Sequence, residues 1–365
     1  MKIAHVVDSM EVGGAEMLVS QMCRLQREQG HEPCVYAVAA LGVLGERMRT
    51  EGFAVQPNVG RHLPDATRNF FRIFKASRPD VVHLHNPTPT IYAAPAARIA
   101  GVRSIVSTRH SLVAPPRNPV MEFKYTIAAK FCDWIVGICD ATANNLKSAH
   151  SAPEGKIVRI YNGTLALPRV AKEQWPSKSG FTLVYVGRVE PVKNHVLLLN
   201  AFHAALTSMP DLQLWMVGDG SERKNLENLA TKLGIATAVT FWGQQLDVAP
   251  FFSAADAFIM SSTSEGLPMS LLQAFSLGLP AIVTDVGGMA EVVQLARGGL
   301  IVSVTDPGDM AKAILRLASS STEREQFAIS AKTAFHAHFM LPVMLDAYMN
   351  LYRDAARARH ATKFS

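Results

Sequence analysis

Two basic residues in the second half of this 365-residue chain have the types and spacing of an anion-binding pair. Arg188 and Lys193 follow the apolar segment 182–186 within a few residues of each other. Arginine can donate two parallel hydrogen bonds to a phosphate, and lysine adds a compact charge, so together they suit a diphosphate. Two solvated surface charges are the alternative, but their place directly after an apolar segment favours binding.

An acidic residue precedes a predicted helix in the segment 264–270, Ser-Glu-Gly-Leu-Pro-Met-Ser. Proline is favoured in the first turn of a helix, so Pro268 marks its start. A helix N-terminus presents unpaired N–H groups to an anion, and Glu265 just before it could accept hydrogen bonds from sugar hydroxyls. A helix-capping acid is the ordinary alternative, but it leaves the Gly-Leu-Pro that follows unexplained.

The first half offers glycines and histidines after predicted strands. Gly13 and Gly14 would let the backbone approach a ligand closely, although a tight turn with Glu16 at the helix dipole is the more ordinary interpretation. Their spacing is not the Gly-x-Gly-x-x-Gly of a nicotinamide site. His85 and His110 each stand just beyond a strand, where a structural histidine is common; His110 gains weight from its polar neighbours.

The sequence lacks the usual ligands of a metal. No Asp-x-Asp occurs, and the 4 cysteines have no zinc spacing, so they are expected to be reduced core residues. We therefore expect no metal and no other cofactor, with Arg188, Lys193 and backbone N–H groups meeting the charge of a leaving diphosphate. The short apolar start before Asp8 predicts no signal peptide, and no apolar stretch reaches about 18 residues, so a cytoplasmic protein is expected.

Apolar segments alternate with helical patterns along the whole chain, which predicts parallel sheets covered on both faces. The segments expected as strands are 2–7, 34–39, 81–84, 104–107, 182–186, 212–217, 239–242, 257–261, 281–284 and 300–304. We predict two doubly wound α/β domains facing a central cleft, residues 1–168 and 169–341. A final helix within 342–365 is expected to pack back across the junction onto the first domain. Ligands of such sheets bind beyond the carboxyl ends of the strands.

Composition and charge narrow the class of partner. With 48% hydrophobic and 18% charged residues, the chain is globular rather than disordered. Residues 1–170 carry 20 lysines and arginines against 13 acidic residues, while residues 171–365 carry 16 against 17. The basic half suggests a phosphorylated substrate, an anionic lipid surface or nucleic acid. Nucleic acid is disfavoured, because no helix-turn-helix, zinc or ribonucleoprotein signature occurs.

One predicted helix raises the question of peripheral membrane contact. Residues 66–78 place Arg68, Arg72 and Lys75 on one face and phenylalanines near the other. Such a helix could rest on anionic lipid. An ordinary helix with its phenylalanines in the core is the favoured interpretation.

Four motifs in this order resemble the family-4 retaining glycosyltransferases of GT-B fold. They are Gly-Gly-Ala-Glu near the start, Gly-Arg-x-x-x-x-Lys opening the second half, Gly-Asp-Gly at 218–220, and Glu-Gly-Leu-Pro with Ala-Phe-x-x-Gly-x-Pro after it. The resemblance runs from Met1 to about Tyr352. It implies transfer of a hexosyl group from a nucleotide-diphosphate sugar to a glycan, lipid-linked or small-molecule acceptor, in surface polysaccharide or glycolipid biosynthesis. It also implies retention of the anomeric configuration without a metal.

The same resemblance implies roles for individual residues. The catalytic set would be His110, Arg188, Lys193 and Glu265. Donor contacts would come from Gly13, Gly14, Glu16, Gly187, Gly218, Gln244, Gly266, Leu267, Pro268, Met269 and Gln273.

Two departures from the family's pattern stand out. Gln273 replaces the glutamate that usually binds the ribose, which leaves the choice between a UDP-sugar, the favoured donor, and a GDP-sugar open. Asn-Gly-Thr-Leu at 162–165 lacks the aspartate of the usual Asn-Gly-x-Asp. The alternatives are a nucleotide-sugar 2-epimerase on the same architecture and an inactive nucleotide-sugar-binding relative.

Overall fold

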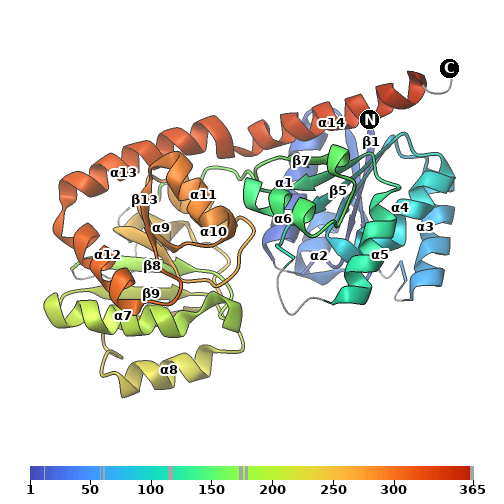
Figure 1. The fold of residues 1–365 in the computed structure, drawn as a ribbon. Helices are drawn as coiled ribbons and strands as arrows, with labels where there is room; N and C mark the ends of the chain where they lie inside the picture. The colour runs from blue at the N-terminus through green and yellow to red at the C-terminus, as the bar shows by residue number, and fades with distance from the viewer. Residues whose placement is uncertain are drawn as a thin grey trace. The chain divides into compact units, whose positions relative to one another are not determined.

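The chain forms two compact α/β units. The computed structural model describes residues 1–11, 13–57, 59–60, 62–113, 118–171, 176 and 180–361. One unit comprises Met1–Gly163 and Leu341–Ser365, and the other comprises Thr164–Met340 (Figure 1). Each is built on a sheet of parallel strands, as the alternation of apolar segments and helices predicts.

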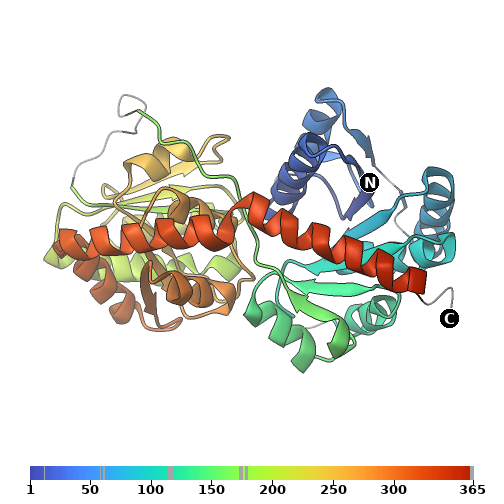
Figure 2. The same cartoon turned by 90° about the horizontal axis from the view of Figure 1, so that it is seen from above.

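The sheet of the first unit has seven strands in the order β3-β2-β1-β4-β5-β6-β7. These strands are β1 (Lys2–Val7), β2 (Glu32–Ala37), β3 (Ala54–Gln56), β4 (Val81–His85), β5 (Ser104–Arg109), β6 (Trp134–Gly137) and β7 (Ile157–Arg159). Its helices are α1 (Gly14–Glu28), α2 (Gly42–Thr50), α3 (Leu63–Ser77), α4 (Pro87–Ala100), α5 (Pro119–Ala129), α6 (Asp140–Ser148) and α14 (Leu341–Ala361). The last helix, α14, packs against α1 and β5 of this unit (Figure 2).

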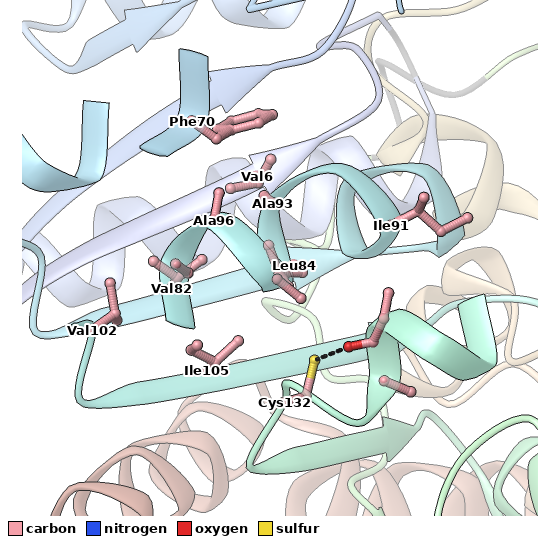
Figure 3. Packing of buried hydrophobic residues seen from close by; sticks show 14 of the residues in the cluster. Val6, Phe70, Val82, Leu84, Ile91, Ala93, Ala96, Val102, Ile105 and Cys132 are labelled. Carbon is pink, nitrogen blue, oxygen red and sulfur yellow. Dashed lines mark hydrogen bonds between the residues drawn. The ribbon is translucent and has the colours of Figure 1, made fainter. Parts of the chain in front are cut away.

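Strand β4 shows how the two faces of this sheet differ. Val82 and Leu84 point into an apolar core that α3 and α4 cover with Phe70 and Ala93 (Figure 3). Small alanines on α4 let this helix lie close to the strands, so the core is fully buried here. Successive side chains of a strand point to opposite faces, so the intervening residues of β4 lie on the other face. Those residues are Val81, His83 and His85, and all three are buried.

The sheet of the second unit has six strands in the order β10-β9-β8-β11-β12-β13. These strands are β8 (Thr182–Val186), β9 (Gln213–Val217), β10 (Val239–Gly243), β11 (Ala257–Met260), β12 (Ala281–Thr284) and β13 (Gly299–Val302). Its helices are α7 (His195–Ser208), α8 (Arg223–Lys232), α9 (Ala249–Ala254), α10 (Met269–Ser276), α11 (Gly287–Ala296), α12 (Pro307–Ser319) and α13 (Ser321–Ala334).

Both sheets reverse their strand order at one place, between β1 and β4 in the first unit and between β8 and β11 in the second. At such a switch point the loops beyond the carboxyl ends diverge, and ligands bind in the crevice that this leaves. Three loops begin at these strands: the loop after β1 carries Gly13, the loop after β8 carries Arg188, and the loop after β11 carries Glu265. The topology therefore directs attention to the same loops that the motifs indicate.

All the strands predicted from the sequence are present, with boundaries that differ by up to two residues. The prediction missed β3, β6 and β7, which have only three or four residues each and give little periodicity. The boundary between units also differs from the predicted one after residue 168. Thr164 forms a bridge with Met340, and the Leu167 N–H donates to Ser276 Oγ at 3.1 Å, so this segment belongs to the second unit. Part of the linker predicted up to Gly180 lies outside the described residues.

The cysteines and the phenylalanines of α3 lie in the core, as expected from the sequence. Cys23, Cys34, Cys132 and Cys139 are free and buried. Phe70 and Phe74 of α3 are fully buried in the core, so the aromatic face of this helix is not available to a membrane. Within the described residues, no helix combines the length and apolar character needed to cross a bilayer.

Candidate functional site

Two loops of the second unit lie side by side at the carboxyl edge of its sheet. They follow β8 and β11, which pair in parallel although far apart in the sequence. Ser261 Oγ donates to the carbonyl of Lys193 at 2.8 Å, and the Thr263 N–H donates to the carbonyl of Val192 at 2.9 Å. Hydrogen bonds therefore join the loop that carries Lys193 to the loop that carries Glu265.

Lys193 and Glu265 form an ion pair between Nζ and Oε1. Their side chains are only 15% and 13% exposed, so solvent screens this pair less than a surface pair. Ser262 Oγ donates to the same carboxylate oxygen at 2.9 Å. The structure thus brings together two of the predicted catalytic residues and fixes the carboxylate from two sides.

Arg188 stands at the other end of the loop after β8. Its backbone carbonyl accepts a hydrogen bond from the Tyr185 hydroxyl at 2.7 Å, which anchors the residue. The side chain is exposed, and among the described residues it has neither a hydrogen-bond partner nor an ion-pair partner. All five N–H donors of the guanidinium therefore remain for a ligand.

Glycines allow the loops after β8 and β9 to approach each other. Gly218 has a φ of 137°, and a Cβ there would lie 1.9 Å from the Gly187 carbonyl oxygen. A Cβ at Gly220 would lie 2.3 Å from the Val189 oxygen, and one at Gly187 would lie 2.8 Å from the Tyr185 hydroxyl. The near atoms at Gly218 and Gly220 belong to the backbone, so packing alone requires these two glycines, whereas a side chain at Gly187 would require the Tyr185 ring to shift. Donor contacts of Gly187 and Gly218 remain a prediction.

The Glu-Gly-Leu-Pro segment leads directly into α10, which begins at Met269 as the prediction requires. Gly266 and Leu267 are buried, whereas Pro268 and Met269 are partly exposed. The Gly266 carbonyl accepts a hydrogen bond from the Gly288 N–H at 2.7 Å, which ties the loop to the start of α11. The first turn of α10 is therefore held rigidly beside Glu265.

The two glutamines that would read the nucleoside lie in different settings. Gln273 is partly buried on α10, and its backbone carbonyl accepts a hydrogen bond from Ser276 Oγ at 2.7 Å. Gln244 is exposed directly after β10. Both lie in loops or helices that follow strands of the same sheet, and their contacts with a base or ribose remain predictions.

His195, which the sequence analysis did not single out, begins α7 just after Lys193. It is buried against Tyr185 with ring centroids 4.5 Å apart, and its Nε2 has no hydrogen-bond partner in the described part of the chain. Burial lowers the pKa of His195 to about 4, so the ring is neutral. The apolar residues that follow it made this histidine resemble an ordinary helical core residue.

In the first unit, Glu16 takes the ordinary role that the sequence analysis favoured. Gly13 is the N-cap of α1, and a Cβ on it would lie 2.3 Å from Glu16 Oε2. The carboxylate therefore folds back on the helix N-terminus, where the dipole favours a negative charge. Gly14, the first residue of α1, is exposed and leaves the backbone open to a ligand.

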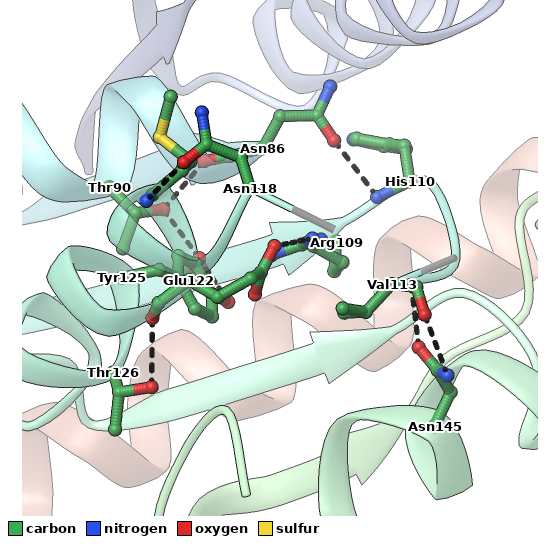
Figure 4. Close-up of polar contacts among 12 residues, drawn as sticks. Asn86, Thr90, Arg109, His110, Val113, Asn118, Glu122, Tyr125, Thr126 and Asn145 are labelled. Atoms are coloured by element: carbon green, nitrogen blue, oxygen red, sulfur yellow. Dashed lines mark hydrogen bonds and ion pairs between the residues drawn. The ribbon is translucent and has the colours of Figure 1, made fainter. Parts of the chain in front are cut away.

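His110 begins a loop that two asparagines hold in place (Figure 4). The His110 N–H donates to Asn86 Oδ1 at 3.1 Å, and the Val113 N–H donates to Asn145 Oδ1 at 2.7 Å. Asn86 has a φ of 74°, a conformation that is strained for a residue other than glycine. Such strain often occurs at functional sites. Neither asparagine was predicted from the sequence; the signal for Asn86 was its place after a strand and before Pro87.

Arg109 does not face the same way as His110. It is buried, forms an ion pair with Glu122 of α5 at 2.6 Å and lies over the Tyr125 ring (Figure 4). Neighbouring strand residues point to opposite faces of the sheet, which explains the difference. Arg109 therefore fixes α5 to β5 and leaves His110 as the polar side chain at this strand end.

A cluster of buried histidines lies behind His110. His5, His83 and His85 each offer a nitrogen within 4.8 Å of the others, which is a spacing that could hold a metal ion. All six ring nitrogens already have hydrogen-bond partners, so the cluster is satisfied without an ion. The contacts are His5 with Gln26 and His85, His83 with Thr108 and Tyr352, and His85 with His5 and His110.

Two family descriptions match the chain. Glycosyltransferase Family 4 matches residues 12–164, and Glycosyl transferases group 1 matches residues 170–334, so together they span both units. The chain belongs to glycosyltransferase family 4. The Lys193–Glu265 pair lies in the part that matches group 1, and His83 and His85 of the histidine cluster lie in the part that matches family 4.

Relatives and solved structures agree with this family. Over 201 residues the chain is 34% identical to the lipopolysaccharide core biosynthesis glycosyltransferase LpsE of Rhizobium meliloti, covering 54% of this chain and 57% of that protein. It is 27% identical over 267 residues to an Escherichia coli UDP-Gal:alpha-D-GlcNAc-diphosphoundecaprenol alpha-1,3-galactosyltransferase, covering 68% and 69%.

Among solved structures, Anabaena Alr3699/HepE in complex with UDP superposes with a TM-score of 0.82 at 18% identity, covering 97% of this chain and 100% of that one. This likeness confirms the predicted GT-B fold of the glycosyltransferase.

Proposed function

We propose that this glycosyltransferase moves a hexosyl group from a nucleotide-diphosphate sugar to an acceptor hydroxyl, with retention and without a metal. The observation that carries the proposal is the arrangement of Arg188, Lys193 and Glu265 around one switch point. The Arg188 guanidinium has no partner among the described residues, and the Lys193–Glu265 ion pair is largely shielded from solvent. A UDP-sugar is the favoured donor, and the likeness in fold to a protein solved with UDP supports it.

The diphosphate of the donor would lie between Arg188 and Lys193. Arg188 donates hydrogen bonds to the phosphate oxygens, while Lys193 and the first N–H groups of α10 add positive charge. Glu265, which Ser262 and Lys193 hold in position, accepts hydrogen bonds from sugar hydroxyls. The charge on the leaving diphosphate is therefore stabilised by the Arg188 guanidinium, which is available to a ligand, and by Lys193 and the N–H groups of α10, which are already oriented before the reaction.

The proposed reaction is a transfer with retention. The bond between sugar C1 and the diphosphate oxygen breaks, and its electron pair passes to that oxygen. The acceptor hydroxyl attacks C1 from the same face and transfers its proton to the departing diphosphate. Within the first unit, His110 would bind a hydroxyl of the donor sugar, and Gly14 would allow close approach of the backbone.

The acceptor class is proposed from the relatives. LpsE acts in lipopolysaccharide core biosynthesis, and the Escherichia coli relative acts on a sugar linked to diphosphoundecaprenol. We propose a glycan or lipid-linked saccharide of a surface polysaccharide or glycolipid as the acceptor.

An assay with full-length protein tests this proposal. Purified protein in EDTA is incubated with UDP-glucose, UDP-galactose, UDP-N-acetylglucosamine or GDP-mannose, with and without polyprenyl-diphosphate-linked saccharides and lipopolysaccharide core. We expect nucleotide release that depends on acceptor, and an NMR spectrum of the product with the donor's anomeric configuration. An epimerised donor without acceptor, or release that EDTA abolishes, would contradict the proposal.

Helix α5 offers a surface for the lipid that would carry such an acceptor. Val120, Phe123 and Ile127 lie on one face of this helix and are 58%, 67% and 44% exposed. Lys124 and Lys130 beside them are exposed as well. An apolar stripe flanked by lysines fits an anionic lipid surface, and the basic balance of residues 1–170 supports that partner.

Sedimentation with vesicles checks this surface. The protein should pellet with phosphatidylglycerol vesicles at low salt and much less at high salt, since part of the attraction is electrostatic. Phe123→Ser with Ile127→Ser should abolish pelleting. Ile329→Ser, which changes an isoleucine on α13 that is 63% exposed, should not. Unchanged pelleting of the double variant would exclude α5 as the lipid-binding face.

A further inference from the structure

Four buried or partly buried side chains form a continuous row of hydrogen bonds that ends at His110. Gln26 Oε1 lies 2.9 Å from His5 Nε2, and His5 Nδ1 lies 3.1 Å from His85 Nε2. His85 Nδ1 in turn lies 3.1 Å from His110 Nε2. Each ring uses the same two nitrogens in the same order, so the row has a direction. Its members come from α1, β1, β4 and the end of β5, which the parallel pairing of β1, β4 and β5 places next to one another.

Each imidazole in this row is neutral and carries one N–H. Burial lowers the pKa of His5 and His110 to about 4, and it lowers the pKa of His85 well below its ordinary value. A neutral imidazole donates from one nitrogen and accepts at the other. The tautomer of one ring therefore dictates the tautomer of the next.

The oxygen of Gln26 sets the direction of the whole row. In the orientation that the structure shows, the carboxamide oxygen faces His5 and only accepts, so His5 donates from Nε2 and accepts at Nδ1. His85 must then donate from Nε2 to His5, and His110 must donate from Nε2 to His85. We propose that Gln26, His5 and His85 are positioning residues that hold His110 in the Nε2–H tautomer, with a bare Nδ1 that accepts a hydrogen bond from a substrate hydroxyl.

The surroundings of His110 fit this assignment. His110 Nδ1 has no hydrogen-bond partner in the described part of the chain, so it is available to a ligand. Asn86 fixes the backbone of His110, and the contact of Nε2 with His85 holds the ring. With the Gln26 oxygen on His5, as in the structure, reversing the row would bring two acceptors face to face at 2.9 Å, and they would repel each other. Gln26 Nε2 has no hydrogen-bond partner among the described residues, so only a turned carboxamide would reverse the row, and the tautomer of His110 reports which orientation is present.

The tautomer of His110 limits the kind of ligand group that it can bind, and this part of the inference rests on the proposed function. A bare Nδ1 takes an O–H donor and disfavours a phosphate or carboxylate oxygen, which can only accept. His110 would therefore contact a hydroxyl of the sugar rather than the diphosphate. Diphosphate recognition is then left to the second unit, where Arg188 and Lys193 lie.

The tautomers can be read directly from the ligand-free protein. Histidine labelled with 15N gives a two-bond 1H–15N spectrum in which protonated and bare ring nitrogens differ clearly. Signals among the 12 histidines are assigned with His110→Gln, His85→Gln and His5→Gln variants. We expect at pH 7.5 a protonated Nε2 and a bare Nδ1 for all three. A protonated Nδ1 on His110 would overturn the inference.

A change at Gln26 tests whether this residue determines the tautomer of His110 through the two histidines between them. Gln26→Met keeps the size of the buried side chain but removes the acceptor, so both directions of the row become available. We expect a mixture of His110 tautomers and a donor KM that rises about twofold with kcat unchanged, since about half of the molecules would present the wrong nitrogen. Gln29→Met, on an exposed position of the same turn region, should change neither. A single unchanged His110 tautomer in Gln26→Met would contradict the role of Gln26.

Failure of this inference differs from failure of the proposed function. The spectrum of the wild-type protein is recorded without substrate, so it does not depend on transferase activity or on the folding of a variant. Acceptor-dependent transfer with a protonated His110 Nδ1 would refute the inference alone. A bare Nδ1 in a protein without transferase activity would refute the proposed function alone.

Discussion

Arg188→Ala and Lys193→Ala should each lower kcat with a nucleotide sugar by roughly 100-fold or more, as removal of a preoriented charge-stabilising donor does in other enzymes. Arg188 has no partner to lose among the described residues, so its removal should leave the unfolding free energy unchanged. The effect of Arg188→Ala would therefore report on the departing diphosphate rather than on the fold. Turnover is measured with saturating donor and acceptor.

Lys193→Ala needs a separate control because it leaves the Glu265 carboxylate, only 13% exposed, without its cation. Lys193→Ala with Glu265→Gln removes the unpaired charge, so this double variant should regain stability but not turnover. Lys224→Ala, which removes an exposed charge on α8, should leave kcat unchanged. Near-normal kcat in both Arg188→Ala and Lys193→Ala would remove the proposed electrostatic mechanism.

Acidification from pH 7.5 to pH 5 should destabilise the first unit strongly. The folded-state pKa of His5 and of His110 is lowered to about 4, whereas an unfolded histidine titrates near 6.5. Between these values the unfolded chain binds protons that the folded chain does not. Stability is therefore complete above pH 6.5 and falls as the pH drops toward 4, by about 2 kcal/mol for each of the two residues at pH 5.

Urea unfolding at pH 7.5, 6.5, 5.5 and 5 measures this loss, and hydrogen exchange of peptides from β1 and β4 assigns it to the first unit. Most carboxyl groups remain ionised above pH 5, so histidines dominate this window. His110→Gln should reduce the pH-dependent loss by about 2 kcal/mol at pH 5, because one titrating group is removed. An exposed histidine, replaced in His203→Gln, serves as the control. Equal stability at pH 7.5 and pH 5 would contradict the burial of these rings as neutral groups.

The sequence by itself determined the architecture of this glycosyltransferase and the loops of its site. Short apolar segments alternate with helical patterns along the chain, and this alternation is typical of parallel strands covered by helices, so the two sheets were predictable. Gly13 follows such a segment in the first unit, and Arg188 and Glu265 follow two in the second. Within each sheet the carboxyl ends of parallel strands lie at the same edge. The sequence alone therefore predicted that these residues lie at such an edge. Very short strands such as β3 and β7 were missed, because three residues carry no measurable period.

The tertiary structure decided which side chains meet. Lys193 and Glu265 are 72 residues apart, and only the pairing of β8 with β11 makes them an ion pair. The row of hydrogen bonds joins four separate segments, through Gln26, His5, His85 and His110, and no local sequence pattern predicts it. The direction of a hydrogen bond and the burial that keeps an imidazole neutral arise from neighbours brought together by folding. A linear sequence does not contain those distances, and so the polarity of the histidine row follows from the fold alone.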